Sequence, residues 1–142
     1  MYGPGGWHVV MDDDSIANGS TQISWHSSSR VALVRYTSGA HLAASDGVFL
    51  VDAPTTWLGA SGTPFAILAD ANGLRETDAP CRSRVSKFFK QHRDTAVIAL
   101  VNLGPVIHIV VEMFRLGTGI QLKTFESEPA ARSWLRARGI AA

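Results

Sequence analysis

The chain has 142 residues, of which 46% are hydrophobic and 18% charged, and its formal net charge at pH 7 is +1. This length predicts one domain with an internal hydrophobic core, and the composition excludes a largely disordered chain. The single cysteine, Cys81, cannot form an internal disulfide, so we expect a reducing compartment, the cytoplasm. We expect neither a membrane span nor a signal peptide, because no apolar run approaches ~18 residues.

The charged residues are unevenly distributed along the chain. Residues 1–70 carry a net charge of −4, and residues 71–142 carry +5. A basic half of this kind favours anionic partners. However, the overall charge is far from that of a basic DNA-binding domain, and no recognition-helix motif accompanies the basic residues. We therefore expect no nucleic-acid partner.

The first half of the chain begins with few structural signals. We predict that residues 1–20 form an N-terminal extension, partly irregular, and that residues 21–142 form a single domain. The acidic run Asp12–Asp14 lacks the alternate spacing of a calcium-binding loop, so we expect no metal site there. The runs Thr21–His26 and Val31–Tyr36 are rich in β-formers and are separated by three serines, which predicts an antiparallel hairpin.

The segment from 37 to 58 carries apolar residues at helical spacing in its second half. We expect a helix there, although Pro54 removes a backbone donor and should kink or end it. Residues 64–69 are apolar on both faces, as in the middle of a covered sheet. The segment 70–78 that follows is polar and contains glycine, so we expect a loop.

The second half of the chain alternates predicted helices and strands. The first of these helices is amphipathic and continues to residue 93, with Cys81, Val85 and Phe89 on its apolar face. It is followed by a strand at 95–101, a helix at 105–116, a strand at 121–125 and a closing helix at 128–138. This order predicts an α/β domain with a mostly parallel sheet.

Three of these segments resemble the bacterial SpoIIAA-like group of STAS domains. They are Pro64–Asp70, a central strand with a terminal acidic residue; Thr95–Val101, the next parallel strand; and Phe125–Leu135, an acidic cap and a helix ending in Trp-Leu. The resemblance covers about residues 20–138. It implies a small mixed sheet of four to five strands, with an N-terminal antiparallel hairpin followed by parallel strands and helices mainly on one side. It also implies a non-enzymatic regulatory module that binds a protein partner.

We expect the partner to bind at the segment 70–78 and the basic face of the next helix, because sites in α/β sheets lie at the carboxyl ends of parallel strands. Some members of the family are phosphorylated on a serine or threonine in an Asp-Ser-Gly type of motif, which this chain lacks. Only Thr77 and Ser83 could serve as weak phospho-acceptors, and Thr77 is better explained as a cap of the next helix, a position that Asp78 could also occupy. The predicted partner-binding residues are Asp70, Asn72, Gly73, Thr77, Asp78, Arg82, Arg84 and Lys87.

The helix at 105–116 suggests an alternative function. It is apolar on nearly every side, which favours a helix packed between the sheet and its neighbours. The alternative is that one of its faces lines a cavity or contacts a second copy of the chain. The SpoIIAA-like group shares its fold with larger CRAL-TRIO lipid-binding domains, which implies a small apolar or lipid-like ligand as the alternative. Candidate lining residues are His108, Val111 and Glu112.

No catalytic motif accompanies these residues. His108 and Glu112 are four residues apart and can pair on one helix face, but no nucleophile lies beside them in the sequence. Cys81 belongs to a predicted apolar face, where an inert buried thiol is expected. We therefore expect no enzyme, no metal and no cofactor.

Overall fold

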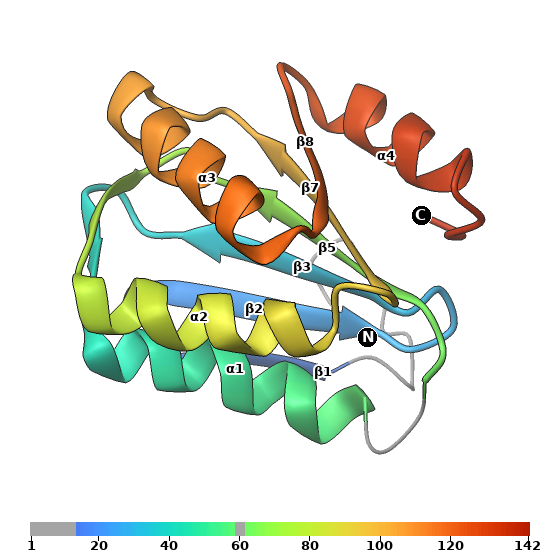
Figure 1. The fold of residues 1–142 in the computed structure, drawn as a ribbon, viewed down its shortest axis with the longest axis horizontal. Coiled ribbons are helices and arrows are strands. Elements are labelled where there is room, and N and C mark those ends of the chain that lie inside the picture. Colours follow the sequence, from blue (N-terminus) through green and yellow to red (C-terminus); the bar gives the residue numbers. More distant parts are fainter. Residues whose placement is uncertain (1–13, 59–61) are drawn as a thin grey trace, which may run out of the picture.

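The computed structural model describes residues 14–58 and 62–142. Six strands form one sheet in the order β1-β2-β3-β5-β7-β8 (Figure 1). The pairs β1–β2 and β2–β3 are antiparallel, and the pairs β3–β5, β5–β7 and β7–β8 are parallel. The strands of this sheet are β1 (Asp14–Ala17), β2 (Thr21–His26), β3 (Val31–Tyr36), β5 (Phe65–Asp70), β7 (Ala96–Val101) and β8 (Gln121–Phe125). The predicted α/β fold, with a hairpin followed by parallel strands, is confirmed.

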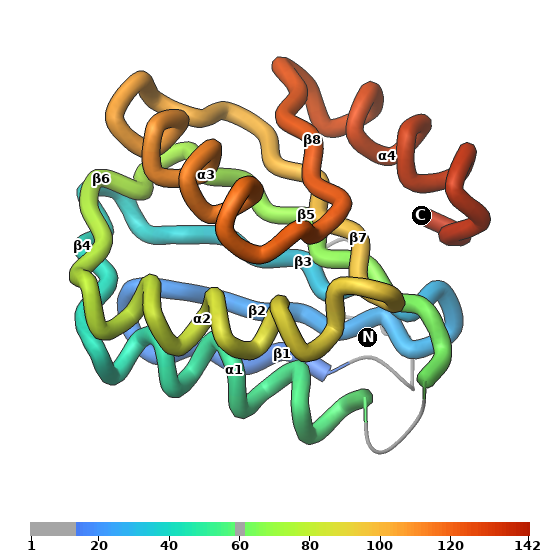
Figure 2. Tube along the Cα trace, viewed as in Figure 1, coloured from blue at the N-terminus to red at the C-terminus, as the bar shows by residue number. Residues whose placement is uncertain are grey.

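Two further strands and four helices complete the chain. The strands β4 (Ala40–Leu42) and β6 (Leu74–Thr77) pair in parallel and form a separate small sheet, which lies at one end of the molecule (Figure 2). The helices are α1 (Ala44–Leu58), α2 (Ala79–Gln91), α3 (Pro105–Thr118) and α4 (Glu128–Arg136). The helices form one layer on each face of the main sheet, which is twisted.

The main sheet has six strands, one more than expected, because β1 lies in the stretch predicted as partly irregular. The prediction of a loop at 70–78 was also wrong, since it contains β6. Similarly, the segment 37–58 contains β4 before its helix begins. These three strands have only three or four residues each, which is too short for an alternating pattern to be recognised.

The helices are distributed three to one over the two faces of the main sheet (Figure 1). On one face, Ile67 and Ile98 pack in a cluster with residues of α1, α2 and α3, including Phe89. On the other face, Leu68 packs with Leu135 of α4. Successive residues of β5 therefore enter two different clusters, as the alternation of a strand requires. The expectation of helices mainly on one side is confirmed.

The helix α1 continues through Pro54 to Leu58, so of the two predicted effects of Pro54, a kink or an end, the end is excluded. Pro54 is buried, and the hydroxyls of Thr55 and Thr56 donate to the carbonyls of Val51 and Asp52 at 2.7 and 3.0 Å. Packing of the helix outweighs the one backbone hydrogen bond that proline removes.

Close contacts fix α1 against its neighbours. At Gly47, an added Cβ would lie 2.9 Å from the Cα of Cys81, so only glycine allows α1 and α2 to approach this closely. Next to it, the Asp46 carboxylate accepts hydrogen bonds from the Ala43 amide at 2.7 Å and from Asn18 at 2.8 Å. Burial raises the pKa of Asp46, but hydrogen bonds from Ser20, Ala43 and Asn18 outweigh it, so the net pKa lies below its ordinary value. The carboxylate therefore ties the β1–β2 turn to the start of α1.

Candidate ligand-binding site

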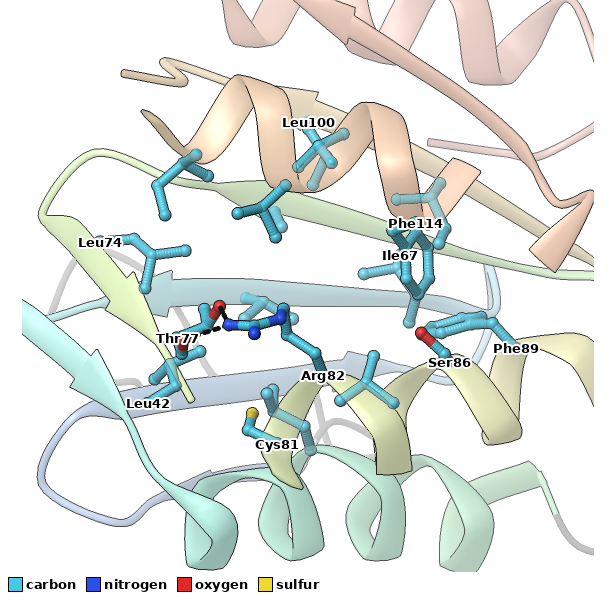
Figure 3. Close-up of a pocket in the computed structure, with 18 of the residues that line it drawn as sticks. Leu42, Ile67, Leu74, Thr77, Cys81, Arg82, Ser86, Phe89, Leu100 and Phe114 are labelled. Carbon is cyan, nitrogen blue, oxygen red and sulfur yellow. Dashed lines mark hydrogen bonds between the residues drawn. The ribbon is translucent and has the colours of Figure 1, made fainter. Parts of the chain in front are cut away.

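A cavity of about 490 Å³ lies between the main sheet and the helices α2 and α3 (Figure 3). Its floor includes Ala32 and Ala69 from the two central strands β3 and β5. Because alanine projects little beyond the backbone, these positions leave space that larger side chains would fill. The volume falls within the range of about 300–1,000 Å³ that is typical of small-molecule sites.

Each of the two helices presents one stripe of side chains to the cavity. On α2 the stripe is Arg82, Val85, Ser86 and Phe89, and on α3 it is Ile107, Val110, Val111 and Phe114. Both sets follow the spacing i, i+3, i+4, i+7, which places their members on one helix face. The walls are therefore apolar except for Arg82 and Ser86 on α2.

Two polar residues of the lining, Thr77 and Arg82, lie together where β6 meets α2, whereas Ser86 lies further along α2 beside Phe89 (Figure 3). The Arg82 guanidinium donates from Nη1 to the Thr77 carbonyl oxygen, and also to Thr77 Oγ1 at 3.1 Å. Burial raises the pKa of the Cys81 thiol to about 11, so the thiol stays protonated and weakly nucleophilic at neutral pH. Burial also raises the pKa of the Tyr36 hydroxyl, which lies at the end of β3. The cavity is thus apolar, with an uncharged interior and a cationic mouth.

The predicted partner-binding residues do not form one surface. Thr77 and Arg82 line the cavity and Arg84 and Lys87 do not, although all three basic residues are exposed. Ser83, a predicted phospho-acceptor, is also exposed and lies outside the lining. A helix turns by about 100° per residue, so Arg82 and Arg84 leave α2 in nearly opposite directions.

Asp70 and Gly73 stabilise the turn that links β5 to β6. The Asp70 carboxylate accepts hydrogen bonds from the Asn72 amide at 2.9 Å and from the Asn102 side chain at 3.0 Å. Gly73 has φ +95°, and an added Cβ would lie 2.8 Å from the carbonyl oxygen of Thr37. Asn102, which the sequence reasoning missed, follows β7 directly, so its place beside Asp70 could be found from the pairing of β5 with β7.

Asp78, not Thr77, is the N-cap residue of α2, and its side chain makes no capping hydrogen bond. Of the two predicted cap residues, Asp78 therefore occupies the cap position and Thr77 ends β6. The Asp78 carboxylate instead contacts His41 of β4, with 2.5 Å between Asp78 Oδ1 and His41 Nε2. Glu76 Oε2 lies 3.4 Å from the other ring nitrogen of His41. This cluster joins β4, β6 and the start of α2 beside the mouth of the cavity.

The His41 cluster predicts a pH-dependent contribution to stability. The hydrogen bond with Asp78 raises the pKa of His41; desolvation opposes this rise, and the charges of Asp78 and Glu76 add to it. Because the folded pKa exceeds the unfolded value of about 6.5, the contribution is complete below pH ~6.5 and is lost as pH rises through the folded pKa. The variant His41→Gln should therefore lower the urea midpoint at pH 5.5 and have less effect at pH 9. Asp78→Asn should remove the same dependence, and equal effects of His41→Gln at both pH values would contradict it.

Of the three predicted ligand-lining residues, Val111 lines the cavity, whereas His108 and Glu112 do not. His108 is exposed on α3. Glu112 pairs with Arg115, whose Nη2 donates to Glu112 Oε1 at 2.9 Å, and this hydrogen bond holds the pKa of Glu112 below its usual range. The predicted pairing of His108 with Glu112 is therefore replaced by a Glu112–Arg115 pair.

In residues 14–58 and 62–142, no three His, Cys, Asp or Glu side chains are grouped so that they could hold a metal ion. Within the same residues, no helix combines the length and apolarity needed to cross a membrane.

Comparisons with known proteins agree with this architecture. The sequence matches no family model and no curated protein. Among solved structures, it is similar to an uncharacterized protein of the DUF3478 family with a SpoIIAA-like fold from Shewanella loihica PV-4. The identity is 16%, the TM-score is 0.63, and the match covers 86% of this chain and 98% of that one.

A second similar structure is the murine Solute Carrier 26 family member A9 anion transporter in the inward-facing state. The identity is 17%, the TM-score is 0.54, and the match covers 76% of this chain but only 18% of the transporter. Identities this low concern the fold alone. The chain has the SpoIIAA-like fold that its sequence pattern predicted.

Proposed function

We propose that this chain is a non-catalytic binding module that holds a small apolar molecule in the cavity between its sheet and the helices α2 and α3. The observation that carries this proposal is the 490 Å³ cavity with its almost wholly apolar lining. Protein interiors are packed nearly as tightly as organic crystals, and voids larger than a water molecule are few. Side chains that face a void lose dispersion contacts, which an apolar ligand would restore.

A titration with the uncharged fluorescent probe N-phenyl-1-naphthylamine tests this proposal. We expect saturable binding with one site per chain, and displacement of the probe by 1-decanol, because both molecules are apolar and fit a cavity of this volume. A fluorescence increase that does not saturate, or that decanol does not reverse, would overturn the proposal.

A protein partner is the second candidate function, favoured by a separate feature of α3. Val106, Ile109, Met113 and Leu116 are between 62% and 74% exposed. Their spacing of three and four residues places them on one outer stripe, as in the contact positions of a coiled coil. Met113 also lines the cavity, whereas Val106, Ile109 and Leu116 do not. These exposed residues contribute little to the core and suit contact with another apolar surface. A second copy of this chain is the partner that we test first.

Light scattering, which measures the mass of the particle in solution, tests whether a dimer forms through this stripe or through the basic surface predicted from the sequence. The double variant Ile109→Glu with Leu116→Glu should convert a dimer of the chain to a monomer, because it places four carboxylates in the contact; neither residue lines the cavity. The double variant Arg84→Glu with Lys87→Glu alters the exposed basic side of α2 and should leave the dimer intact. A wild-type chain that is monomeric at high concentration would overturn self-association through α3.

A further inference from the structure

The formal charge in the lining of the cavity is limited to one of the described residues. Among the described residues that line it, Arg82 alone carries a formal charge, and the other polar side chains are neutral. Arg82 is the first member of the α2 stripe, and its side chain extends from the helix toward Thr77 across the mouth (Figure 3). A ligand in this cavity therefore meets apolar side chains along most of its length and one cation at one end.

The guanidinium of Arg82 retains hydrogen-bonding capacity. It has five N–H donors, and its two hydrogen bonds within the described chain both leave from Nη1 and go to Thr77. The hydrogen bonds to Thr77 hold the group in place, while Nε and Nη2 are free of such bonds. A planar fork of this kind fits the two oxygens of a carboxylate or phosphate, and holding it in advance lowers the entropic cost of binding.

No acidic side chain within residues 14–58 and 62–142 forms an ion pair with Arg82. The nearby acids of β6 and of the α2 start, Glu76 and Asp78, both contact His41 instead. An anion at the mouth would thus supply the partner that the described residues do not.

The volume of the cavity limits the size of its occupant. A water molecule occupies roughly 30 Å³ in the liquid, and a non-hydrogen atom of an alkyl chain takes a similar space. A cavity of 490 Å³, incompletely filled, therefore holds a chain of about a dozen non-hydrogen atoms.

We infer that the ligand is a single-chain amphiphile of about this size, whose carboxylate or phosphate binds Arg82 at the mouth and whose alkyl chain lies between α2, α3 and the sheet. This inference rests on the proposed function and adds the chemical class of the ligand. It excludes cationic amphiphiles, because their head group would lie against Arg82.

Competition against N-phenyl-1-naphthylamine by decanoate, decyl phosphate and 1-decanol tests the inference. The three competitors share one alkyl chain, so the ratio of their affinities reports the head group alone. For the wild-type chain we expect the two anions to bind about tenfold more tightly than the alcohol, because a hydrogen bond to a charged group contributes a free energy of about this size. This preference should weaken with added salt. Acetate and inorganic phosphate, which lack the chain, should not displace the probe.

Three variants assign the preference to Arg82. Arg82→Gln should bring the ratio of decanoate to decanol affinity close to one, and Arg82→Lys should retain part of the preference. Arg84→Gln is the matched control, since it removes the same charge from the exposed side of α2 and should leave the ratio unchanged. Arg82→Gln also removes the hydrogen bonds to Thr77 and could loosen the site as a whole. Such loosening would lower the affinities for decanoate and decanol equally, so the ratio of the two affinities is a better readout than either affinity itself.

The outcomes separate this inference from the proposed function. Displacement by neither decanoate nor decanol would overturn both. Equal displacement by the two, or a preference for the anion that Arg82→Gln leaves unchanged, would overturn the role of Arg82 while the apolar site stands. Displacement by acetate as strong as that by decanoate would show a simple anion site and would also overturn the inference.

Discussion

Replacement of Val111 by tryptophan is expected to lower the affinity for N-phenyl-1-naphthylamine by at least about tenfold, which corresponds to about 1.4 kcal/mol. Val111 belongs to the α3 stripe that lines the cavity. A tryptophan there would occupy the space that the ligand needs. The position is only half-buried, so we expect the larger side chain to be accommodated by the open cavity rather than by displacement of the core. The probe titration measures the effect.

The matched control is Val106→Trp, the same substitution on the same helix. Val106 is 67% exposed and lies on the outer stripe of α3, away from the cavity. This variant should bind the probe like the wild-type chain. Equal affinities of Val111→Trp and the wild type, or an equal loss in both variants, would contradict a site at the inner face of α3.

Replacement of Leu135 by alanine is expected to lower the free energy of unfolding by about 2–5 kcal/mol, the usual cost of such a truncation in a core. Leu135 is fully buried and packs α4 against the second face of the sheet, in a cluster with Leu68 and Val101. Urea denaturation of the two proteins provides the comparison. Since α4 lies on the face opposite the cavity, binding of the probe by the folded variant should persist.

Ser133→Ala is the control for this second prediction. Ser133 is exposed on the same helix, and a surface substitution of this type changes stability by about 0.5 kcal/mol or less. If Leu135→Ala were no more destabilising than Ser133→Ala, α4 would not cover the sheet as described.

The elements with a strong local pattern could be predicted from the sequence. The hairpin strands β2 and β3 match their predicted residues, and α3 begins at Pro105 as expected. Each of these elements is long enough for its periodicity to be visible, and each has a clear start or stop signal. The strands β1, β4 and β6 were missed because three or four residues carry no such pattern, and only pairing with a distant partner makes them strands.

The candidate site was predicted less completely, because a cavity is not a property of any one segment. Ala32 and Ala69 lie far apart in the sequence and face the same space only after β3 pairs with β5. An alanine on a buried strand looks the same in the sequence whether the space above it is filled or empty. The alternative hypothesis of an apolar site on the 105–116 helix included Val111, but its two polar residues lie outside the lining.

A closer reading of one helix would have improved the site prediction. Arg82, Val85, Ser86 and Phe89 follow the spacing of a single face, so the sequence already separates Arg82 from Arg84 and Lys87. The sequence analysis placed all three on the basic outer face of the helix, whereas the structure brings Arg82 to the lining of the cavity. The hydrogen bonds from Arg82 to Thr77, in contrast, depend on the pairing of β6 with β4 and could not be anticipated.

The most direct test of the central claim is an NMR measurement of intermolecular NOEs between unlabelled decanoate and the protein labelled with ¹³C in its methyl groups. The account predicts NOEs from the alkyl chain to the methyls of Val85, Val110 and Leu122, which line the cavity on α2, α3 and β8. NOEs confined to the outer methyls of Val106 and Leu116, or the absence of NOEs at saturating decanoate, would contradict a ligand site between the sheet and these helices.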